Sequence, residues 1–407
     1  MSAVRKKLLF DIGSTYFKVA ENGTIRHWFR DFNRPIFEDL MDKCGDLVAK
    51  YRPEEIQICS SANGGLSTLI IGISNSFSLK YAINIAFNSG INIIDTVLYH
   101  EIERATPPVE TIDVVIIVGG IDGVGGIFDE KLIGFLEKCT FQNIVYVGSA
   151  DERNFLSGHI RRLVVLENII TEKLKINERA LKTYLTDLYQ ADIMGKEDIK
   201  QLYEITANQI FSTPYVVNRA LPFISRRLDV TDPFIVIDIG GATTDIHYSR
   251  DLVSDNITGE GGYDRLVFKK LGVYKSRESL VHTARQNEFV YELLNHLNVT
   301  ENVLEEESEA ATKVLMQLAI FLVLYKVSRH HSEYVELKLE NLNNIVLTGG
   351  ITKVLEKEDA ETIIRFFYKK LLHFHQIPEI VLDRNYEIWT YGMQAILENN
   401  EATKELP

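Results

Sequence analysis

Cysteine is scarce in this sequence, which contains only Cys44, Cys59 and Cys139. These thiols lack the spacing of a zinc site and suggest no disulfide framework, so a reducing compartment fits the chain. Long hydrophobic runs are also missing. The longest, residues 314–327, contains Gln317 and is too short to cross a bilayer, so we expect a buried helix there. The polar N-terminus leads directly into an apolar stretch, so no signal peptide is expected and a cytoplasmic location is predicted.

Positive charge is in the minority, with 44 Lys and Arg against 57 Asp and Glu and a net charge of −13. Binding to a phosphate backbone needs clustered cations, so neither nucleic acid nor a membrane is expected as a partner. Signatures of P-loop ATPases, HExxH metalloproteases and CxxC redox proteins are absent. His330, His331, His373 and His375 have no other ligands at metal-binding spacing and are interpreted as surface or interface residues. The length of 407 residues predicts at least two domains.

One motif occurs twice. Residues 8–15 and 235–245 each contain an apolar run that ends in Asp-Ile-Gly and is followed by small hydroxyl residues. Such a run predicts a buried strand, and the glycine lets the next turn approach a ligand closely. Backbone N–H groups and hydroxyls then face oxyanions, and an Asp at the strand end suits a divalent cation bound through water. The duplication predicts two related halves that bind nucleotide phosphates from two sides.

Each residue of this site also has an ordinary structural interpretation. Asp11 and Asp238 are predicted to hold Mg²⁺, the alternative being a carboxylate that caps a tight turn. Lys18 is predicted to neutralise phosphate charge, or else to face solvent from a strand. Asp245 either orients a metal-bound or attacking water or is a carboxylate at a hairpin edge. The remaining predicted phosphate contacts, whose alternative is turn stabilisation, are Gly13, Ser14, Thr15, Gly240, Gly241, Thr243 and Thr244.

The chain organisation supports a duplicated architecture. Residues 8–31 read as three strands, joined at the second turn by Asn22-Gly23, which favours a hairpin. The second half mirrors this with predicted strands at 235–238, 246–249 and 257–259. The intervening segments 69–74, 79–87, 91–99, 114–118, 128–138 and 144–147 alternate between strand and helix patterns, which predicts an inserted α/β unit with parallel strands. Further helices are predicted within 177–224, where Pro214 suits a first turn, and at 359–374 and 387–399.

A third glycine-rich turn, residues 345–350, follows another buried strand. Three such turns in this order resemble the actin, Hsp70 and sugar-kinase superfamily, in which two loops clamp phosphates and the third meets adenosine. The resemblance assigns Gly349 and Gly350 to adenosine or its α-phosphate, against a plain strand-to-helix turn. Residues 261–266 also resemble the glycine pair and Asp that open a helix after the second phosphate loop of Hsp70. The expected fold is α/β, with two RNase-H-like domains flanking a nucleotide cleft.

A narrower resemblance, to the GlmL/MutL family, rests on five segments, namely residues 11–18, 59–66, 118–123, 238–245 and 382–386. That family accompanies adenosylcobalamin-dependent mutases such as glutamate mutase. The resemblance implies an ATP/ADP- and Mg²⁺-binding accessory or reactivating factor with a mutase as partner, and slow ATP hydrolysis. A small-molecule kinase and a filament-forming ATPase remain alternatives. The loop 119–126 is either a second anion or cofactor site or a flexible turn.

The predicted domain ranges follow from these patterns. They are 1–66 with 151–230 for the first half, 67–150 for the insertion, 231–386 for the second half and 387–407 for a closing helix and tail.

Overall fold

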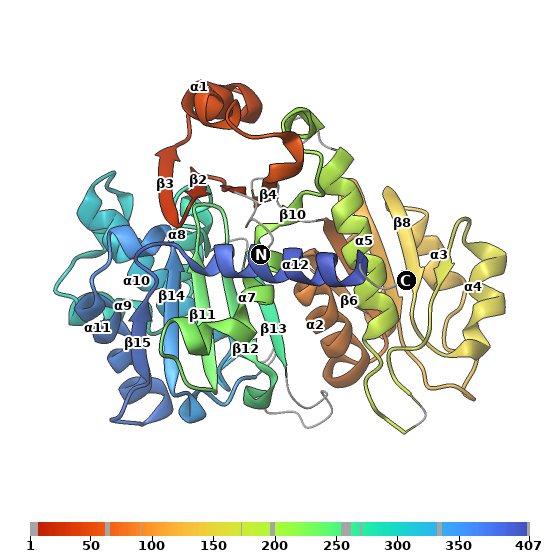
Figure 1. The fold of residues 1–407 in the computed structure, drawn as a ribbon. Helices are drawn as coiled ribbons and strands as arrows, with labels where there is room; N and C mark the ends of the chain where they lie inside the picture. The colour runs from red at the N-terminus through yellow and green to blue at the C-terminus, as the bar shows by residue number, and fades with distance from the viewer. Residues whose placement is uncertain are drawn as a thin grey trace.

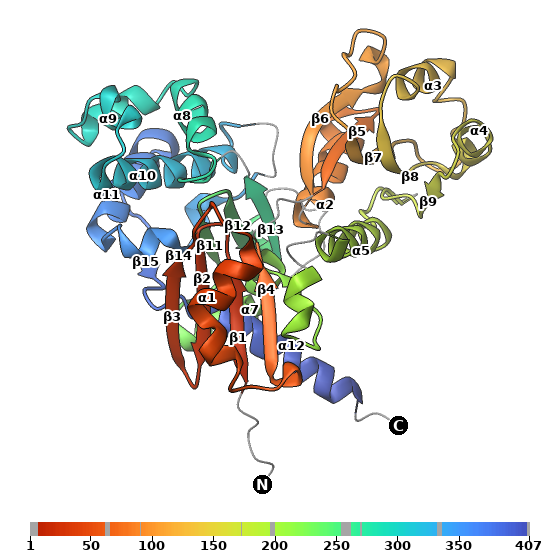
Figure 2. The ribbon, with the colours of Figure 1, turned by 90° about the horizontal axis from the view of Figure 1, so that it is seen from above.

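The computed structural model describes residues 7–61, 66–89, 91–171, 173–195, 200–253, 262–268, 271–331 and 336–404. Within these ranges the strands form three sheets of five strands each. Two of the sheets belong to the duplicated halves, and the third lies to one side of them (Figures 1 and 2). The predicted domain ranges stay a prediction.

The first sheet begins with the first copy of the motif. Its strands are β1 (Leu8–Ile12), β2 (Tyr16–Glu21), β3 (Thr24–Phe29), β4 (Ile56–Ser60) and β10 (Phe211–Ser212), in the order β10-β4-β1-β2-β3. The predicted hairpin is present, with Asn22 and Gly23 at φ values of 52° and 81°. Positive φ at both positions is what a type I′ turn requires. Helix α1 (Ile36–Val48) then carries the chain from β3 to β4.

The second sheet repeats this topology. Its strands are β11 (Phe234–Ile239), β12 (Thr244–Ser249), β13 (Tyr263–Phe268), β14 (Asn344–Gly349) and β15 (Glu379–Leu382), in the order β13-β12-β11-β14-β15. In both sheets, three antiparallel strands come first in sequence. The fourth strand then pairs in parallel with the first, and the fifth pairs in parallel with the fourth. This shared order confirms two RNase-H-like halves of the actin, Hsp70 and sugar-kinase type.

One expectation drawn from Hsp70 is wrong. Residues 263–268 do not open a helix but form β13, which pairs antiparallel with β12. The apolar run Leu266–Phe268 is buried and completes the second sheet, and the next helix, α8 (Arg277–Arg285), begins later. Gly261 and the strand predicted at 257–259 lie outside the described residues.

The third sheet is the inserted unit. It contains β5 (Ser67–Gly72), β6 (Asn92–Leu98), β7 (Ile112–Val118), β8 (Phe141–Tyr146) and β9 (Val164–Val165), all parallel, in the order β6-β5-β7-β8-β9. This is a doubly wound order whose direction reverses between β5 and β7. One face packs on α2 (Lys80–Asn88) and α5 (Arg179–Gly195), and the other packs on α3 (Glu130–Leu136) and α4 (Arg153–His159). The predicted α/β insertion with parallel strands is therefore present.

Two helices fill the space between the sheets of the two halves. These are α7 (Thr213–Arg227), which has Pro214 in its first turn as predicted, and α12 (Ile388–Lys404). Their side chains form one core with Leu9 of the first sheet and Val236 of the second. The helices cross closely at Gly392, where a Cβ atom would lie 1.8 Å from the carbonyl oxygen of Val216. Glycine is needed at this crossing because any side chain would collide with the facing backbone.

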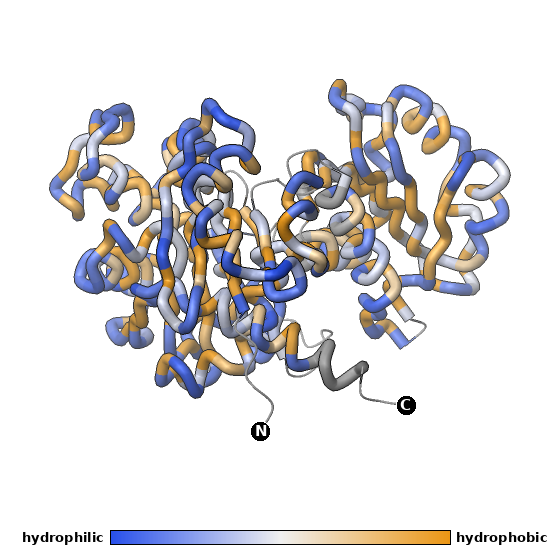
Figure 3. The backbone as a smooth tube through the Cα atoms, turned by 45° about the horizontal axis from the view of Figure 1, so that its top comes forward, coloured by the Kyte–Doolittle hydropathy of each residue, from blue (hydrophilic) through white to orange (hydrophobic). Residues whose placement is uncertain are grey.

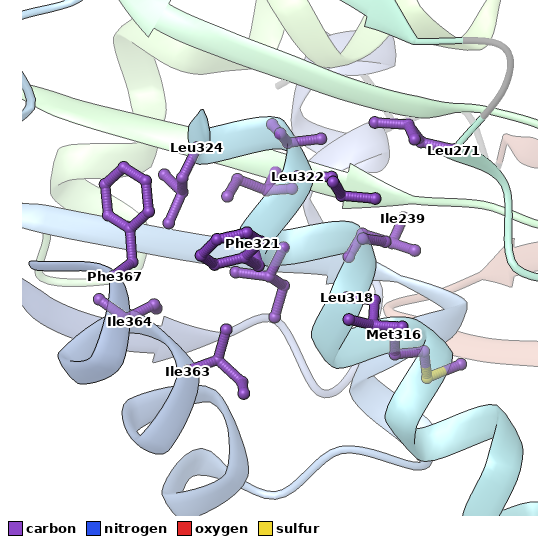
Figure 4. Packing of buried hydrophobic residues seen from close by; sticks show 14 of the residues in the cluster. Ile239, Leu271, Met316, Leu318, Phe321, Leu322, Leu324, Ile363, Ile364 and Phe367 are labelled. Carbon is purple, nitrogen blue, oxygen red and sulfur yellow. The ribbon is translucent and has the colours of Figure 1, made fainter. Parts of the chain in front are cut away.

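The helical part of the second half covers the outer face of its sheet. It contains α8, α9 (Val290–His296), α10 (Glu309–Lys326) and α11 (Lys357–Phe367). The helix α10 is buried as predicted, and Phe321 packs between α10 and α11 (Figure 4). For the helix predicted at 359–374, the α-helical part ends at Phe367, and a π-helical turn follows over Tyr368–Leu372. Hydrophobic segments gather in the sheets, while many outer loops are hydrophilic (Figure 3). Among the described residues no helix has the length and apolar character to span a membrane.

Candidate functional site

The two motif loops have the same local geometry and face each other. In the first, the N–H of Gly13 donates to the carbonyl of Tyr16, and in the second the N–H of Gly240 donates to the carbonyl of Thr243, both at 2.9 Å. A Cβ atom on Gly241 would lie 2.0 Å from Thr15 Oγ1 in the other loop. The loops of the two halves are therefore in direct contact, and glycine at position 241 is what permits it.

A cavity of about 230 Å³ lies between these loops. It is lined by most of the residues predicted from sequence, namely Gly13, Ser14, Thr15, Lys18, Asp238, Gly240, Gly241, Thr243, Asp245, Gly349 and Gly350. Asp11 is 1% exposed and lies behind the lining. Thr244 is fully buried, and its hydroxyl donates to the carbonyl of Leu271 at 2.7 Å. The structure thus brings together residues from three separate segments of the chain at one cavity.

Asp11 is held by three neighbours. Lys18 Nζ donates to Oδ2 at 2.8 Å, while Oδ1 accepts from the Thr213 hydroxyl at 2.6 Å and from the Cys59 thiol at 3.6 Å. Thr213 is the first residue of α7, so Asp11 ties the first motif to the central helix. Burial lowers the pKa of Lys18, but Asp11 and Asp238 raise it by more, so the net shift is upward and the amine stays charged. A permanent positive charge therefore lies in the wall of the cavity.

Asp238 is the corresponding acid of the second motif and lines the cavity directly. Its backbone pairs with Thr348 of β14, next to the third glycine-rich turn. Gly349 there has φ 85°, and a Cβ atom on it would meet Asp238 Oδ1 at 2.2 Å. Burial raises the pKa of Asp238 to about 6, and Asp11 and Asp383 also raise it while Lys18 lowers it. Carboxyl groups with a perturbed pKa are typical of functional sites, and a carboxylate that lines a cavity suits a divalent cation.

Lys18 and Asp245 occupy equivalent positions in the two halves. Lys18 pairs across the hairpin with Asp11, and Asp245 pairs in the same way with Asp238. Asp245 also accepts a hydrogen bond from the Thr243 hydroxyl at 3.1 Å. The duplicated scaffold therefore places the Lys18 ammonium on one side of the cavity and the Asp245 carboxylate on the other. The ammonium suits a bound anion, and the carboxylate suits the orientation of a water molecule.

Aromatic residues at the cavity mouth were missed by the sequence reasoning. Phe29 and Phe32 come from the first half and Tyr274 from the second, and their exposed fractions are 46%, 45% and 52%. The Phe32 and Tyr274 rings stack at 5.4 Å, and Phe29 meets Tyr274 edge-on at 5.8 Å. Phe29 and Tyr274 also line the cavity. These ring contacts bridge the two halves. The sequence around Phe29 and Phe32, or around Tyr274, does not predict that they meet.

Two further residues, for which no role was predicted from the sequence, support the site. Asp383 accepts from the Thr348 hydroxyl at 2.8 Å and from the N–H groups of Glu387 and Ile388, so it joins β14 to the start of α12. The Tyr386 ring lies 5.1 Å from Lys18 Nζ, a cation–π contact that helps to position the amine. Asp383 and Tyr386 lie in segment 382–386, one of the five segments on which the family resemblance rests. That resemblance was the one indication in the sequence that these two residues belong to the site.

The glycine-rich loop 119–126 is not built as an anion cradle. The N–H of Gly123 donates to Asp151, and those of Ile127 and Phe128 donate to Glu152. Carboxylates already occupy these donors, and their negative charge disfavours a phosphate or carboxylate ligand. The interpretation as a second anion site is therefore not supported, and the large apolar side chains that the loop exposes are Ile121 and Val124.

Comparisons with known proteins identify a family that nearly the whole chain resembles. The model of a family described as MutL protein matches residues 7–406. Protein MutL of Clostridium tetanomorphum is 26% identical over 271 residues, which cover 60% of this chain and 58% of that protein. The match thus spans less than two thirds of the relative's length.

Solved structures of low similarity also align with the chain. The activator of 2-hydroxyisocaproyl-CoA dehydratase from Clostridium difficile with bound ADPNP is 12% identical, with coverage of 99% of this chain and 98% of that one and a TM-score of 0.32. The polyphosphate/ATP-glucomannokinase of Arthrobacter sp. strain KM is 10% identical, with coverage of 97% and 99% and a TM-score of 0.30. At such TM-scores these likenesses carry no argument, and the fold assignment rests on the sheet order.

The duplicated sheets and the facing loops define a protein of the actin, Hsp70 and sugar-kinase class. Because the family model covers nearly the whole sequence, the chain belongs to the MutL protein family.

Proposed function

We propose that this protein binds ATP or ADP with Mg²⁺ in the cavity between the two motif loops. The observation that carries the proposal is the contact between Gly241 and Thr15, which places two glycine and hydroxyl loops on opposite sides of one cavity. Ser14 and Thr15 donate hydrogen bonds to the phosphates, and Lys18 supplies the positive charge. Thr243 contributes its backbone N–H, because its hydroxyl already donates to Asp245. Gly349 and Gly350 lie against the adenosine or its α-phosphate.

The acidic residues fit a water-rich Mg²⁺ site. Among the described residues no group of three or more His, Cys, Asp or Glu side chains is arranged to hold a metal. Mg²⁺ usually keeps several waters and binds one or two carboxylates together with nucleotide phosphates, so a larger protein cluster is not required. Asp238 faces the cavity, whereas both oxygens of Asp11 already accept hydrogen bonds. Asp238 is therefore the residue that would contact the hydrated ion. Asp11 would reach the ion only through a water molecule, or would contribute by positioning Lys18. Asp245 would orient the attacking water.

We further propose that nucleotide binding and slow hydrolysis serve an adenosylcobalamin-dependent mutase. This chain would be its chaperone-like accessory or reactivating factor. The support is membership of the MutL protein family together with the resemblance of the motif segments. Slow turnover is expected because the loops come from different halves, so domain motion limits each cycle.

The test is recovery of activity by a mutase of the glutamate mutase type that has been inactivated by turnover. Purified protein, ATP, Mg²⁺ and fresh adenosylcobalamin are added together, and the control omits ATP or uses the Asp238→Ala variant. Recovery that requires both ATP and an intact Asp238 supports the proposal. Equal recovery without ATP, or none with any mutase of this type, contradicts it. Phosphate release without a phosphoryl acceptor in the same reaction separates an ATPase from a small-molecule kinase.

The inserted unit, about residues 67–150, is the proposed partner-recognition element. Neither motif loop needs it, and it presents exposed apolar side chains at Val109 and Val124, with exposed fractions of 99% and 55%. Asp122 is a poor probe, because its carboxylate accepts from the N–H of Ala150 at 2.7 Å and shapes the loop. The sharper variants are Val109→Asp and Val124→Asp. If both keep full binding to the mutase, recognition lies elsewhere, for example on the helical region within 177–224.

A further inference from the structure

A second cavity of about 220 Å³ lies where the two halves and the inserted unit meet. Its wall is formed by α5, by α7, by the end of β10 and by β13, and Ser89 after α2 contributes from the insertion. It shares no lining residue with the cavity between the motif loops. The residues that bear on its chemistry are Lys182, Ser212, Arg219, Asp264 and Arg265.

The lining carries more positive than negative charge. Lys182, Arg219 and Arg265 face one acid, Asp264. That acid is already neutralised, since its carboxylate lies 3.1 Å from Lys182 Nζ and 3.3 Å from Arg250 outside the cavity. Lys182 and Arg250 also pair with Glu178, at 3.9 Å and 2.6 Å, so the positive charge available to a ligand comes from the two arginines of the lining. Arg219 is exposed and forms no ion pair within the part of the chain that the structure describes, whereas Arg265 is only 5% exposed. Arginine is the side chain best suited to hold carboxylate or phosphate groups by paired hydrogen bonds.

Ser212 gives a second and independent indication of a ligand. The residue is 1% exposed, it lines this cavity, and its hydroxyl has no hydrogen-bond partner in the described structure. Buried hydroxyls are nearly always hydrogen-bonded, so an unpaired one facing a polar cavity marks a place for a bound group. A hydroxyl donor beside arginine and lysine matches an oxyanion. We propose that this cavity binds a small molecule through a carboxylate or phosphate group.

The cavity is also connected to the motif loops. Ser212 directly precedes Thr213, whose hydroxyl holds Asp11 at 2.6 Å. Arg265 interacts electrostatically with Asp245, which lines the first cavity. Because the wall contains residues of both halves and of the insertion, any movement between these units changes its shape. If nucleotide binding moves these units, oxyanion binding and nucleotide binding are linked, and each changes the affinity of the other by the same factor.

The test titrates inorganic phosphate and, separately, succinate into protein saturated with a non-hydrolysable ATP analogue and Mg²⁺, so that every phosphate position of the motif loops is already occupied. Calorimetry is expected to detect binding of at least one probe in the millimolar range or tighter. Arg219→Gln should weaken it about tenfold, the usual effect of losing one charged hydrogen bond. Ser212→Leu, which fills the cavity, should abolish it. The matched control is Arg226→Gln, which removes a charge from the same helix outside this lining.

Two results overturn the proposal. One is that neither probe binds the nucleotide-loaded wild type. The other is that a probe binds Arg219→Gln with wild-type affinity, which places the site elsewhere even if Ser212→Leu does not fold. Failure of the ATP analogue to bind at all would instead contradict the proposed nucleotide function. In that case the succinate titration is repeated on the free protein and still tests this cavity.

Discussion

Single glycines decide how closely the functional loops approach each other. Gly241 lies against the Thr15 side chain of the opposite loop, and Gly349 lies against the carboxylate of Asp238. Sequence reasoning identified both glycines because apolar strands precede them. It could not show which atoms they approach, since those atoms belong to segments far away in the chain.

Replacing Gly241 by alanine is expected to push the two motif loops apart. The added methyl group would meet Thr15 Oγ1 at 2.0 Å and Tyr274 Cβ at 3.2 Å. Nucleotide affinity should fall by roughly tenfold to a hundredfold, because a small misplacement of positioned groups has effects of this size. Calorimetry with ADP and Mg²⁺ measures it. The control is Gly158→Ala, where no atom lies within 4 Å of the new methyl group. Equal affinity in both variants would show that the loop contact does not matter.

The ionisation of Asp238 should make both binding and stability depend on pH. Its pKa rises from 3.8 to about 6 because the carboxyl group is buried. Between these values the folded protein retains a proton that the unfolded chain has released, so the free energy of unfolding falls as pH rises from about 4 to 6. Mg²⁺ and nucleotide need the ionised form, so their affinity should rise over the same range.

The matched variant for this prediction is Asp238→Asn, which cannot titrate. Denaturant unfolding and ADP titration at several pH values, on both proteins, isolate the contribution of Asp238 because all other groups titrate in both. Identical pH profiles would mean that the carboxyl group is not the titrating residue.

At the scale of elements, the central helices depend on one close crossing. Gly392→Ala would place a methyl group 1.8 Å from the carbonyl oxygen of Val216, which forces α7 and α12 apart. Overpacking of this kind costs about 1–3 kcal/mol of stability. The opposite is expected for Gly134→Ala in α3, where no atom lies within 4 Å and alanine gains about 0.5–1 kcal/mol in a helix. Urea unfolding measures both. A neutral Gly392→Ala would contradict the close packing described for this pair.

Elements with a strong local pattern could be predicted from the sequence, and elements defined by tertiary pairing could not. The strands β1, β4, β7, β11 and β14 are buried apolar runs, and the Asn22-Gly23 hairpin has its own turn chemistry. By contrast, β10 spans only Phe211–Ser212 and exists because it pairs with β4. Residues 261–266 were compared with a segment of Hsp70 that opens a helix, whereas the pairing of β13 with β12 decides the structure there.

The same distinction holds for the candidate site. The motif residues were found because two copies point to the same chemistry. Thr213 and Tyr274 were not found, because their roles depend on contacts with Asp11 and Phe32 that only the folded chain creates.

At the scale of the whole molecule, the proposed nucleotide binding requires the two halves to move relative to each other. Nucleotide can enter and leave only if the contact between the motif loops opens. The stacked rings of Phe32 and Tyr274 bridge the mouth of the cavity and favour the closed arrangement. A ligand shifts such an equilibrium by its difference in affinity for the two states.

Removing both rings should therefore expand the nucleotide-free protein. In small-angle X-ray scattering, the Phe32→Ala/Tyr274→Ala double variant is expected to have a larger radius of gyration than wild type without nucleotide. Both proteins should become compact with ATP and Mg²⁺. Tyr291→Ala, at a site that is 71% exposed, is the control. Scattering profiles that do not change with nucleotide or variant would exclude this closure.

The central claim is that one nucleotide is held between the two motif loops. Calorimetric titration of ATP with Mg²⁺ into wild type, Asp11→Ala and Asp238→Ala tests it most directly, with circular dichroism to confirm that each variant is folded. We expect one site per chain in the wild type and strongly weakened binding in both folded variants. Unchanged affinity in both variants would contradict it, because the nucleotide would then lie outside the cavity that the duplicated motif creates.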